Sequence, residues 1–365
     1  MIMRIITTLD GEIMGRPDSG RITQRRIAEL AGVSQATVSL VLNARTDGTV
    51  RIPQETRDRI MKVIEETRYV ADPSARRLAG ADNHILGVFT YEPAFPTESL
   101  DFYTPLLAGI EAGAEQVGSD LLLFTSAPAV EGRRRLFHER NRLRLADGLL
   151  LLGVEMDPVE LRRLVEDGIR TVAVGRRDVP EIPYVGIDYV SASRALVEQA
   201  LALGHEKVIF LHRAGLGESV LDRRQGVAEA AAASGLDILD RATAGTAGPD
   251  TAADWLAVRE SGATLVIAEQ PELATALHDH AVRDGIDVPG DLSIVALGSA
   301  ARPGEGATEI TRLSPPRAEL GAHAVALLTR ILSGEDVPAA ERRLLLPCPI
   351  TEGTTLAAPP LEATR

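Results

Sequence analysis

Short apolar runs alternate with helix-like segments through most of this chain, from residue 84 to residue 355. The runs typical of buried strands are HILGVFTY, DLLLFTS, DGLLLLGV, IRTVAVGR, YVGID, KVIFLHR, TLVIAE and LSIVALGS. Segments with apolar residues at helical spacing lie between them, for example TPLLAGIEAGAEQVG, RRLFHERNRLRLA and PVELRRLVEDG. Alternating strands and helices favour parallel sheets covered by helices on both faces. There are too many strands for one ordinary sheet, so we expect two similar lobes.

The carboxyl ends of parallel strands form the usual ligand site of open α/β sheets, so we expect a cleft between the lobes. Five of the 12 aromatic residues fall within fifteen positions, and most of them follow the first strand, in YEPAFPTESLDFY. They are Phe89, Tyr91, Phe95, Phe102 and Tyr103. Aromatic rings suit the apolar face of a sugar or a base. Phe102 and Tyr103 are therefore candidate effector-binding residues as well as candidate core residues, whereas Phe89 is predicted to be core.

The charge of the chain is distributed unevenly. Residues 21–80 carry 11 Lys and Arg against 7 Asp and Glu, a net charge of +4. Residues 81–365 carry 26 against 42, a net charge of −16, within a total of −13. This asymmetry indicates a small basic module joined to a large acidic one, and a basic module favours binding to nucleic acid.

The basic segment contains three predicted helices. Thr23 can cap the first, Gly32 makes a turn, and Ser34 can cap a second helix from Gln35 to Asn43. A third helix starts at Pro53 or Gln54. The residues predicted to be buried by these helices are Ile27, Leu30, Ala31, Val38, Val41, Leu42, Ile60, Val63 and Ile64. Two short helices joined by a tight glycine turn form a helix-turn-helix, whose second helix can lie in the DNA major groove.

The second helix has small polar residues where a solvated helix would carry charges. Ser34, Thr37 and Ser39 can approach phosphates, whereas Gln35, Ala36 and Leu40 can face base edges. A Gln can pair with adenine through two hydrogen bonds, and Ala and Leu can contact a thymine methyl group. The candidate DNA-binding residues in residues 21–71 are Thr23, Ser34, Gln35, Ala36, Thr37, Ser39, Leu40 and Asn43.

The run IAELAGVSQATVSLVLN, followed by TRDRIMKVIEETRYVADPSARRLAG, resembles the DNA-binding headpiece of the lactose-repressor (LacI/GalR) family over residues 21–80. The loop ARTDGTVRIP is longer than in the best-known members. The resemblance implies that DPSARRLAG, within residues 72–83, is the hinge helix that orders when two copies pair over the operator centre. Leu78 matches the leucine that enters a minor-groove base step and kinks the duplex. Arg76 and Arg77 would lie beside phosphates.

Residues 84–355 resemble the periplasmic-binding-protein-like (type I) effector domain of the same family. The matching segments include IRTVAVGRR, VGIDYVSASRALVEQALALGHEKVIFL, DRRQGV and DGIDVPGDLSIVAL. By this resemblance, Asp188 matches the acidic residue of the V-x-x-D run. Arg223 matches the arginine of R-x-x-G that reaches the ligand in relatives, and Arg176 lies at a position that lines the pocket.

The candidate pocket also departs from the family pattern. Where many relatives have Asn-Asp after LVIA, this chain has Gln270 and Pro271, and Gly298 replaces an acidic residue of G-F-D-D. Gln270 remains a candidate effector-binding residue. The loss of two acceptors would remove several hydrogen bonds to a sugar, each worth on the order of 1 kcal/mol. Three interpretations follow: the effector differs, other residues such as Glu269 compensate, or the pocket has weakened.

Several other functions find little support in the sequence. GLGES and GHEK contain residue types found in catalytic sites, but no G-x-S-x-G elbow, Walker A motif or H-E-x-x-H motif occurs. His278 and His280 are two apart, which on a helix turns them away from each other. We therefore expect no catalysis, no metal and no cofactor. The chain has one cysteine, Cys348, and lacks an export signal and an apolar run of about 18 residues. These features favour a cytoplasmic protein without a membrane span.

The sequence thus predicts a small all-α helix-turn-helix headpiece joined to an α/β two-lobed effector domain. We expect a transcriptional repressor that binds double-stranded DNA at a pseudo-palindromic operator and responds to a small-molecule effector such as a sugar. Residues 1–20 are interpreted as a mobile tail, with Met1 or Met14 as the start. Residues 356–365 have no heptads, which favours a homodimer over a coiled-coil tetramer. The alternatives are an exported sugar-binding protein and an effector-blind DNA-binding protein.

Overall fold

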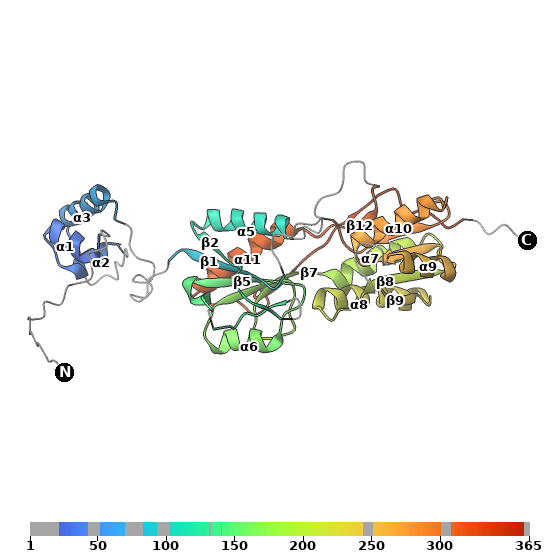
Figure 1. Ribbon diagram of the computed structural model, residues 1–365, viewed down its shortest axis with the longest axis horizontal. Coiled ribbons are helices and arrows are strands. Elements are labelled where there is room, and N and C mark those ends of the chain that lie inside the picture. Colours follow the sequence, from blue (N-terminus) through green and yellow to red (C-terminus); the bar gives the residue numbers. More distant parts are fainter. Residues whose placement is uncertain are drawn as a thin grey trace, which may run out of the picture. The chain divides into compact units, whose positions relative to one another are not determined.

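A computed structural model gives the arrangement of the helices and strands (Figure 1). It describes residues 22–42, 52–69, 83–92, 103–130, 133–139, 141–243, 251–300 and 308–360. The chain divides into two compact units, a headpiece unit (Met1–Asn83) and a large unit (His84–Arg365).

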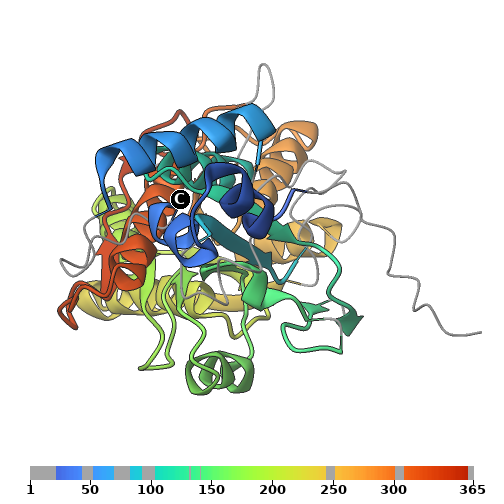
Figure 2. The same cartoon turned by 90° about the vertical axis from the view of Figure 1, so that its left-hand side faces the viewer.

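Three helices form the described part of the headpiece unit (Figure 2, blue). They are α1 (Gln24–Ala31), α2 (Gln35–Leu42) and α3 (Gln54–Thr67). Their buried residues are Ile27, Ala28, Ala31, Val38, Val41 and Ile60. The prediction was wrong for Leu30, which is 47% exposed. Each helical residue advances about 100° around the axis, so the arc buried by the other α1 residues leaves Leu30 outside it.

The first lobe of the large unit is a six-stranded parallel sheet in the order β13-β7-β6-β5-β1-β2. Its strands are β1 (Ile85–Thr90), β2 (Asp120–Phe124), β5 (Gly148–Leu152), β6 (Thr171–Val174), β7 (Tyr184–Ile187) and β13 (Arg343–Leu346). Helices α5 (Thr104–Gln116) and α11 (Arg317–Leu332) lie side by side on one face, and α6 (Pro158–Glu166) covers the other (Figure 1). The contact between α5 and α11 is close, since a Cβ atom on Gly109 would lie 1.9 Å from the carbonyl oxygen of Ala318.

The second lobe is also a six-stranded sheet, in the order β14-β12-β11-β10-β8-β9. Its strands are β8 (Val208–Arg213), β9 (Leu239–Thr243), β10 (Leu265–Ala268), β11 (Ser293–Ala296), β12 (Thr311–Leu313) and β14 (Ile350–Thr351). All neighbours are parallel except β12 and β14. Its helices are α7 (Tyr189–Leu201), α8 (Glu218–Ser234), α9 (Thr251–Ser261) and α10 (Pro271–Arg283). The predicted two-lobed α/β architecture is confirmed.

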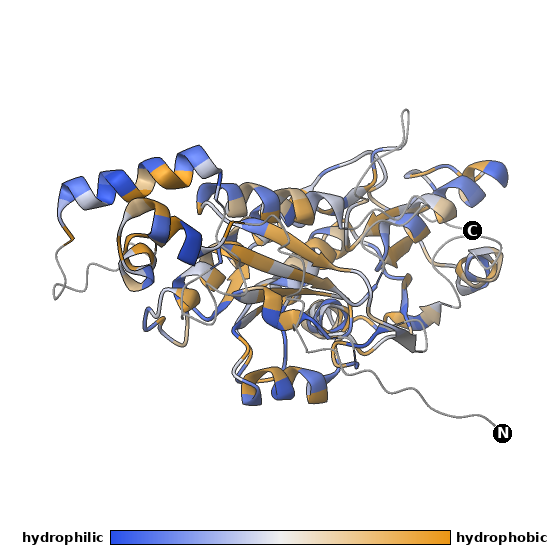
Figure 3. Ribbon diagram, turned by 60° about the vertical axis from the view of Figure 1, so that its left-hand side comes forward, coloured by the Kyte–Doolittle hydropathy of each residue, from blue (hydrophilic) through white to orange (hydrophobic). Residues whose placement is uncertain are grey.

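Alternate residues of the central strands enter different cores, as the two-residue period of a strand requires. In β5, Leu150 and Leu152 join a cluster that runs through both lobes, whereas Leu149 and Leu151 face α6. Because both faces are covered, the central strands are hydrophobic almost throughout, and Figure 3 shows them largely in orange.

The chain passes between the two lobes three times. It leaves the first lobe after β7, returns to it between β12 and α11, and leaves it again between β13 and β14. Cys348 lies in the third crossing, where burial raises the pKa of its thiol to about 11.

The helix predicted from RRLFHERNRLRLA does not form in the described residues of this segment. Arg133–Arg134 is the short strand β4, which pairs with β3 (Ala129–Val130), and Leu143–Leu145 is a 3₁₀ turn. The side chain of Asn141 donates to the Leu136 carbonyl oxygen at 3.1 Å and accepts from the Leu143 N–H at 2.8 Å. Such local bonds compete with helix formation, and the buried leucines that suggested a helix pack under α6 from a loop.

Candidate functional site

The turn between α1 and α2 is fixed by side-chain and backbone caps. Thr23 Oγ1 accepts the N–H of Arg26 at 3.3 Å, which confirms the predicted N-cap of α1. Gly32 ends the helix with φ of 64°, a left-handed conformation that glycine adopts at little cost. Ser34 Oγ then accepts the N–H of Thr37 at 3.1 Å at the start of α2. The guanidinium of Arg59 on α3 donates to the Ala31 carbonyl oxygen at 2.8 Å, which ties the third helix to this turn.

The exposed side of α2 begins at its amino end. Ser34, Gln35 and Ala36 are exposed, and Thr37, Ser39 and Leu40 are half-buried. Val38 and Val41 are buried on the opposite side against the rest of the headpiece core. Small side chains at the amino end of a helix leave its backbone N–H groups accessible to phosphate oxygens. The geometry is that of a helix that can be presented to a duplex.

A cavity of about 410 Å³ lies between the two lobes of the large unit. Its walls come from the carboxyl ends of β5, β6 and β7 in the first lobe and of β8, β10 and β11 in the second. The first turns of α5, α8, α10 and α11 complete it. The volume is in the range of small-molecule sites.

Guanidinium groups are prominent on the second-lobe side of the cavity. The Arg223 guanidinium lies 3.5 Å from the centre of the Tyr189 ring. It donates to the carbonyl oxygens of Leu297 at 2.7 Å and Ser219 at 2.8 Å. Glu269, with a side chain 1% exposed, accepts the backbone N–H of Arg213 at 2.7 Å and its Nη2 at 3.1 Å. These contacts orient Arg223 and Glu269 in the wall, as preorganised recognition requires.

The first-lobe wall contains a buried phenol. Tyr103 Oη donates to the carboxylate of Glu92, whose other oxygen accepts the N–H of Val154 at 3.2 Å. Burial, and then the neighbouring negative charge of Glu92, raise the pKa of Tyr103 well above its usual range, so the phenol stays protonated. Tyr103 is 5% exposed and belongs both to the core and to the cavity wall.

Comparisons with known proteins match both units. Residues 24–72 match the family described as "Bacterial regulatory proteins, lacI family", and residues 197–355 match the "Periplasmic binding protein-like domain". Catabolite control protein A of Priestia megaterium is 26% identical over 331 residues, which are 87% of this chain and 94% of that protein. This chain belongs to the lacI family. As a LacI-family protein it is a DNA-binding transcriptional regulator and not an enzyme.

Solved structures share the fold of this LacI-family regulator. The lac repressor dimer bound to operator and the anti-inducer ONPF has a TM-score of 0.70 and 18% identity, and covers 93% of this chain and 100% of its own. The complex of the transcriptional regulator CelR with cellobiose has a TM-score of 0.62 and 23% identity, and covers 92% and 100% respectively.

The structure brings four of the six predicted effector-binding residues of the regulator to the cavity. Tyr103, Arg176, Arg223 and Gln270 all line it. Asp188 does not, because its carboxylate caps α7 by accepting the N–H of Ser191 at 3.0 Å.

Other predicted positions lie outside the described residues. They are the DNA-binding candidates Asn43, Arg76, Arg77 and Leu78 and the effector-binding candidate Phe102. The tail 1–20 also lies outside them.

The departure from the family pattern at Gly298 leaves space in the cavity. A Cβ atom on Gly298 would have ordinary contacts, 3.6 Å from Pro271 Cδ and 3.7 Å from the Glu269 carbonyl oxygen. The lost acidic side chain is therefore not replaced by a neighbour. Beside this space, Gln270 Oε1 is buried and has no hydrogen-bond partner among the described residues. A ligand donor could satisfy this oxygen, since an unpartnered buried acceptor is costly.

Several residues of the cavity escaped the sequence analysis, notably Arg177, Arg213, Asp222 and Arg317. Arg177 and Arg213 follow or end strands, so the rule that ligands bind at carboxyl ends of strands could have found them. Arg317 begins α11 at a crossing, and its guanidinium donates to Ser299 Oγ at 3.1 Å and to the Ser299 carbonyl oxygen at 2.7 Å. No pattern in the sequence around Arg317 could have identified it, because its partner Ser299 lies in the other lobe.

Within the described residues, no cluster of three or more His, Cys, Asp or Glu side chains could hold a metal ion. None of the described helices combines the length and the apolar character that a membrane span requires.

Proposed function

We propose that this regulator is a cytoplasmic repressor that binds a pseudo-palindromic operator as a homodimer and is controlled by a small molecule in the interlobe cavity. The exposed α2 face supports the DNA part of this proposal. The 410 Å³ cavity at the carboxyl ends of strands from both lobes supports the effector part. This cavity is the observation that carries the proposal, because a ligand touching both lobes can bias their relative orientation and thereby the DNA affinity.

We propose a sugar or a related metabolite as the effector. The CelR structure contains cellobiose, and the cavity here combines the Tyr103 and Tyr189 rings with hydrogen-bonding side chains. Arg176, Arg223 and Gln270 are the proposed polar contacts, and Phe102 remains a proposed aromatic contact. Gln270 Oε1 would accept from a ligand hydroxyl group.

The proposed DNA contacts are Ser34, Thr37 and Ser39 to phosphates and Gln35, Ala36 and Leu40 to base edges. Thr23 and Asn43 would lie at the margins of this contact. Arg76 and Arg77 would contact the phosphates of the operator centre, and Leu78 would enter the central base step.

Selection of bound sites from random duplexes, with the full chain, tests the DNA part. We expect two symmetric half-sites and binding that weakens with salt. Gln35→Ala should relax the preference at one base of each half-site, by about 1–3 kcal/mol of discrimination. Gln54→Ala is the matched control, because Gln54 on α3 is bonded to Asp58 at 2.7 Å. Leu78→Ala should weaken binding and reduce the bend of the duplex, and an unchanged bend angle would contradict the wedge.

An effector-blind DNA-binding protein is the second candidate, favoured by the lost acceptors at Pro271 and Gly298. Thermal shift against sugars, nucleosides and sugar phosphates distinguishes the two. A true effector should raise the Tm of the natural chain and fail to stabilise Gly298→Leu, whose side chain would fill the space beside Gln270. If no compound stabilises the chain while operator binding persists, the effector-blind function is correct.

A further inference from the structure

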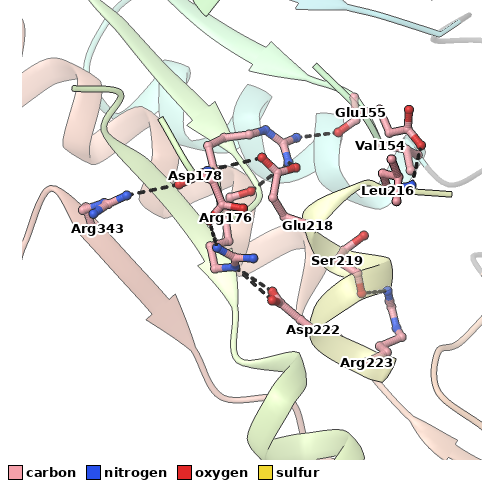
Figure 4. Close-up of polar contacts among 12 residues, drawn as sticks. Val154, Glu155, Arg176, Asp178, Leu216, Glu218, Ser219, Asp222, Arg223 and Arg343 are labelled. Atoms are coloured by element: carbon pink, nitrogen blue, oxygen red, sulfur yellow. Dashed lines mark hydrogen bonds and ion pairs between the residues drawn. The ribbon is translucent and has the colours of Figure 1, made fainter. Parts of the chain in front are cut away.

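The two lobes meet at a second place besides the three crossings. Two loops of the first lobe, after β5 and after β6, contact the GLGES segment (residues 215–219) and the first turns of α8 (Figure 4). GLGES contains residue types that are common in catalytic sites, but its contacts give it a different role.

Polar contacts connect the lobes at this place. Arg176 Nε donates to both carboxylate oxygens of Asp222, at 2.8 and 3.1 Å. Arg177 Nη1 donates to Glu218 Oε2 at 3.0 Å, and the N–H of Asp178 donates to Glu218 Oε1 at 3.3 Å. Glu155 Oε1 accepts the N–H of residue 216 at 3.1 Å. Each of these bonds joins a residue of the first lobe to a residue of the second lobe.

The backbones of the two lobes also approach closely here. A Cβ atom on Gly217 would lie 2.7 Å from the carbonyl oxygen of Val154, inside van der Waals contact. Only glycine fits between the lobes at this separation, and any larger side chain would force them apart.

The ion pairs at this contact are largely removed from water. The Arg177 side chain is 2% exposed and the Glu218 side chain is 15% exposed. Burial lowers the pKa of Arg177, and the Glu218 charge opposes that shift. For Arg176, burial lowers the pKa, but the bonds to Asp222 and Asp178 outweigh it and the pKa is raised. Opening the lobes would return these charges to water, so desolvation offsets much of their attraction. Because the two effects offset each other, a ligand can shift the equilibrium between joined and separated lobes in either direction.

The same side chains face the effector cavity. Arg176, Arg177 and Asp222 line it, and Arg177 Nη2 also donates to the carbonyl oxygen of Gly153 in the wall. Arg177 Nε is buried and has no hydrogen-bond partner among the described residues. A molecule in the cavity would therefore contact the groups that join the lobes.

We propose that Glu155 and Arg176–Asp178 of the first lobe, with Gly217, Glu218 and Asp222 of the second, form an interlobe latch that keeps the lobes closed without an effector. These contacts join the two lobes directly, side chain to side chain and side chain to backbone. Its link to DNA affinity rests on the proposed function, because a latch that sets the lobe angle would set the operator affinity of the effector-free regulator.

The distance between the lobes in the full chain, without ligand, tests the latch. Spin labels at cysteines introduced at Glu166 on α6 and Ala232 on α8, both exposed, report one position in each lobe. Cys348 is replaced by Ala so that only the introduced sites are labelled. The natural latch should give one short distance distribution. Gly217→Val should lengthen it by separating the backbones, and Asp222→Asn should lengthen or broaden it by weakening the bond to Arg176.

Leu221→Ala is the matched control, because Leu221 neighbours Asp222 on α8 but is 37% exposed and outside the latch. Its distance distribution should equal that of the natural chain. Circular dichroism and Tm establish whether each variant folds. If Gly217→Val does not fold, Asp222→Asn still tests the latch. A folded Asp222→Asn or Gly217→Val with an unchanged distribution would overturn the latch.

Operator affinity is measured on the same proteins. We expect it to change about fivefold or more in the latch variants and to stay constant in Leu221→Ala. If the distances lengthen but the affinity is unchanged, the latch does not control DNA binding and that part of the inference is wrong. If the natural chain binds no operator, the proposed function fails, while the distances still decide the latch.

Discussion

The headpiece unit and the large unit place their functional residues in opposite ways. In the headpiece, the exposed and half-buried side chains of one continuous segment, Ser34–Leu40, form the accessible face of α2, and six buried residues in the described part of the headpiece support it. In the large unit, the cavity draws on positions from Glu92 to Leu320, which three chain crossings and two sheets bring together. A surface made by local structure depends on caps and a small core, whereas a cavity made by tertiary structure depends on close packing over long sequence distances.

Overpacking the large unit should have the largest effect. Gly109→Val would place side-chain atoms against the Ala318 backbone, which cannot move away as a flexible side chain could. We expect a loss of about 3 kcal/mol or more in the free energy of unfolding. Trp255, the single tryptophan, lies in α9, so its fluorescence during urea unfolding reports the large unit. Ala108→Val, at an exposed position of the same helix, should change little.

A cavity in the headpiece core should cause the next largest loss of stability, and the loss should be confined to the headpiece unit. Ile60 is fully buried, and Ile60→Ala should cost about 3 kcal/mol, a large part of the stability of so small a unit. Hydrogen exchange should show loss of protection in α1, α2 and α3, with loss of operator binding. Met61→Ala, at a site 50% exposed, is the control. A matching shift in the Trp255 transition would show that the two units do not unfold independently.

Removing a helix cap should cost less. Thr23→Ala removes the acceptor for the N–H of Arg26, and we expect a loss of about 1 kcal/mol in headpiece stability. Thr23→Ser keeps the hydroxyl group and should retain most of the headpiece stability. The check is the exchange rate of the α1 amides. Equal protection in Thr23→Ala and the natural chain would mean that tertiary packing, rather than local capping, holds α1.

The smallest effect at neutral pH should come from His205. Its Nε2 donates to the Ala357 carbonyl oxygen and its Nδ1 lies 2.9 Å from Thr264 Oγ1. Burial lowers the pKa of His205 below its ordinary value of 6.5, so the unfolded chain binds the proton more tightly. This contribution to stability should be complete above pH 6.5 and should fall as the pH drops from there toward the lowered pKa.

The Tm between pH 8 and pH 5 measures the His205 contribution. The natural chain should lose more Tm below pH 6.5 than His205→Gln does, although the variant starts lower because it loses packing. Parallel pH profiles of the two proteins would exclude His205 as the titrating group.

The contrast between the units also explains what could be predicted from the sequence. The caps at Thr23 and Ser34 and the turn at Gly32 depend on neighbours within a few residues, and all three have the expected local geometry. Leu30 was misplaced because helical spacing marks an apolar face only to within about one residue. The segment around Asn141 was misjudged because its leucines have helical spacing while its side-chain bonds form a loop.

The cavity could be predicted only in part. Resemblance to relatives located Arg176 and Arg223, and the family pattern showed that acceptors are missing around Gln270. Asp188 carried the expected residue type, but its local role as a helix cap keeps it from the cavity. The latch around Gly217 depends on how far apart two lobes come to rest, and no pattern within one segment encodes that separation.

The three passages of the chain between the lobes make the large unit resistant to being cut in two. After a single proteolytic nick in any one passage, the other two passages still join the two lobes covalently. The hydrophobic cluster that spans both sheets would hold the two resulting polypeptides together. Cleaved molecules should therefore migrate as intact protein under native conditions and separate only in denaturant.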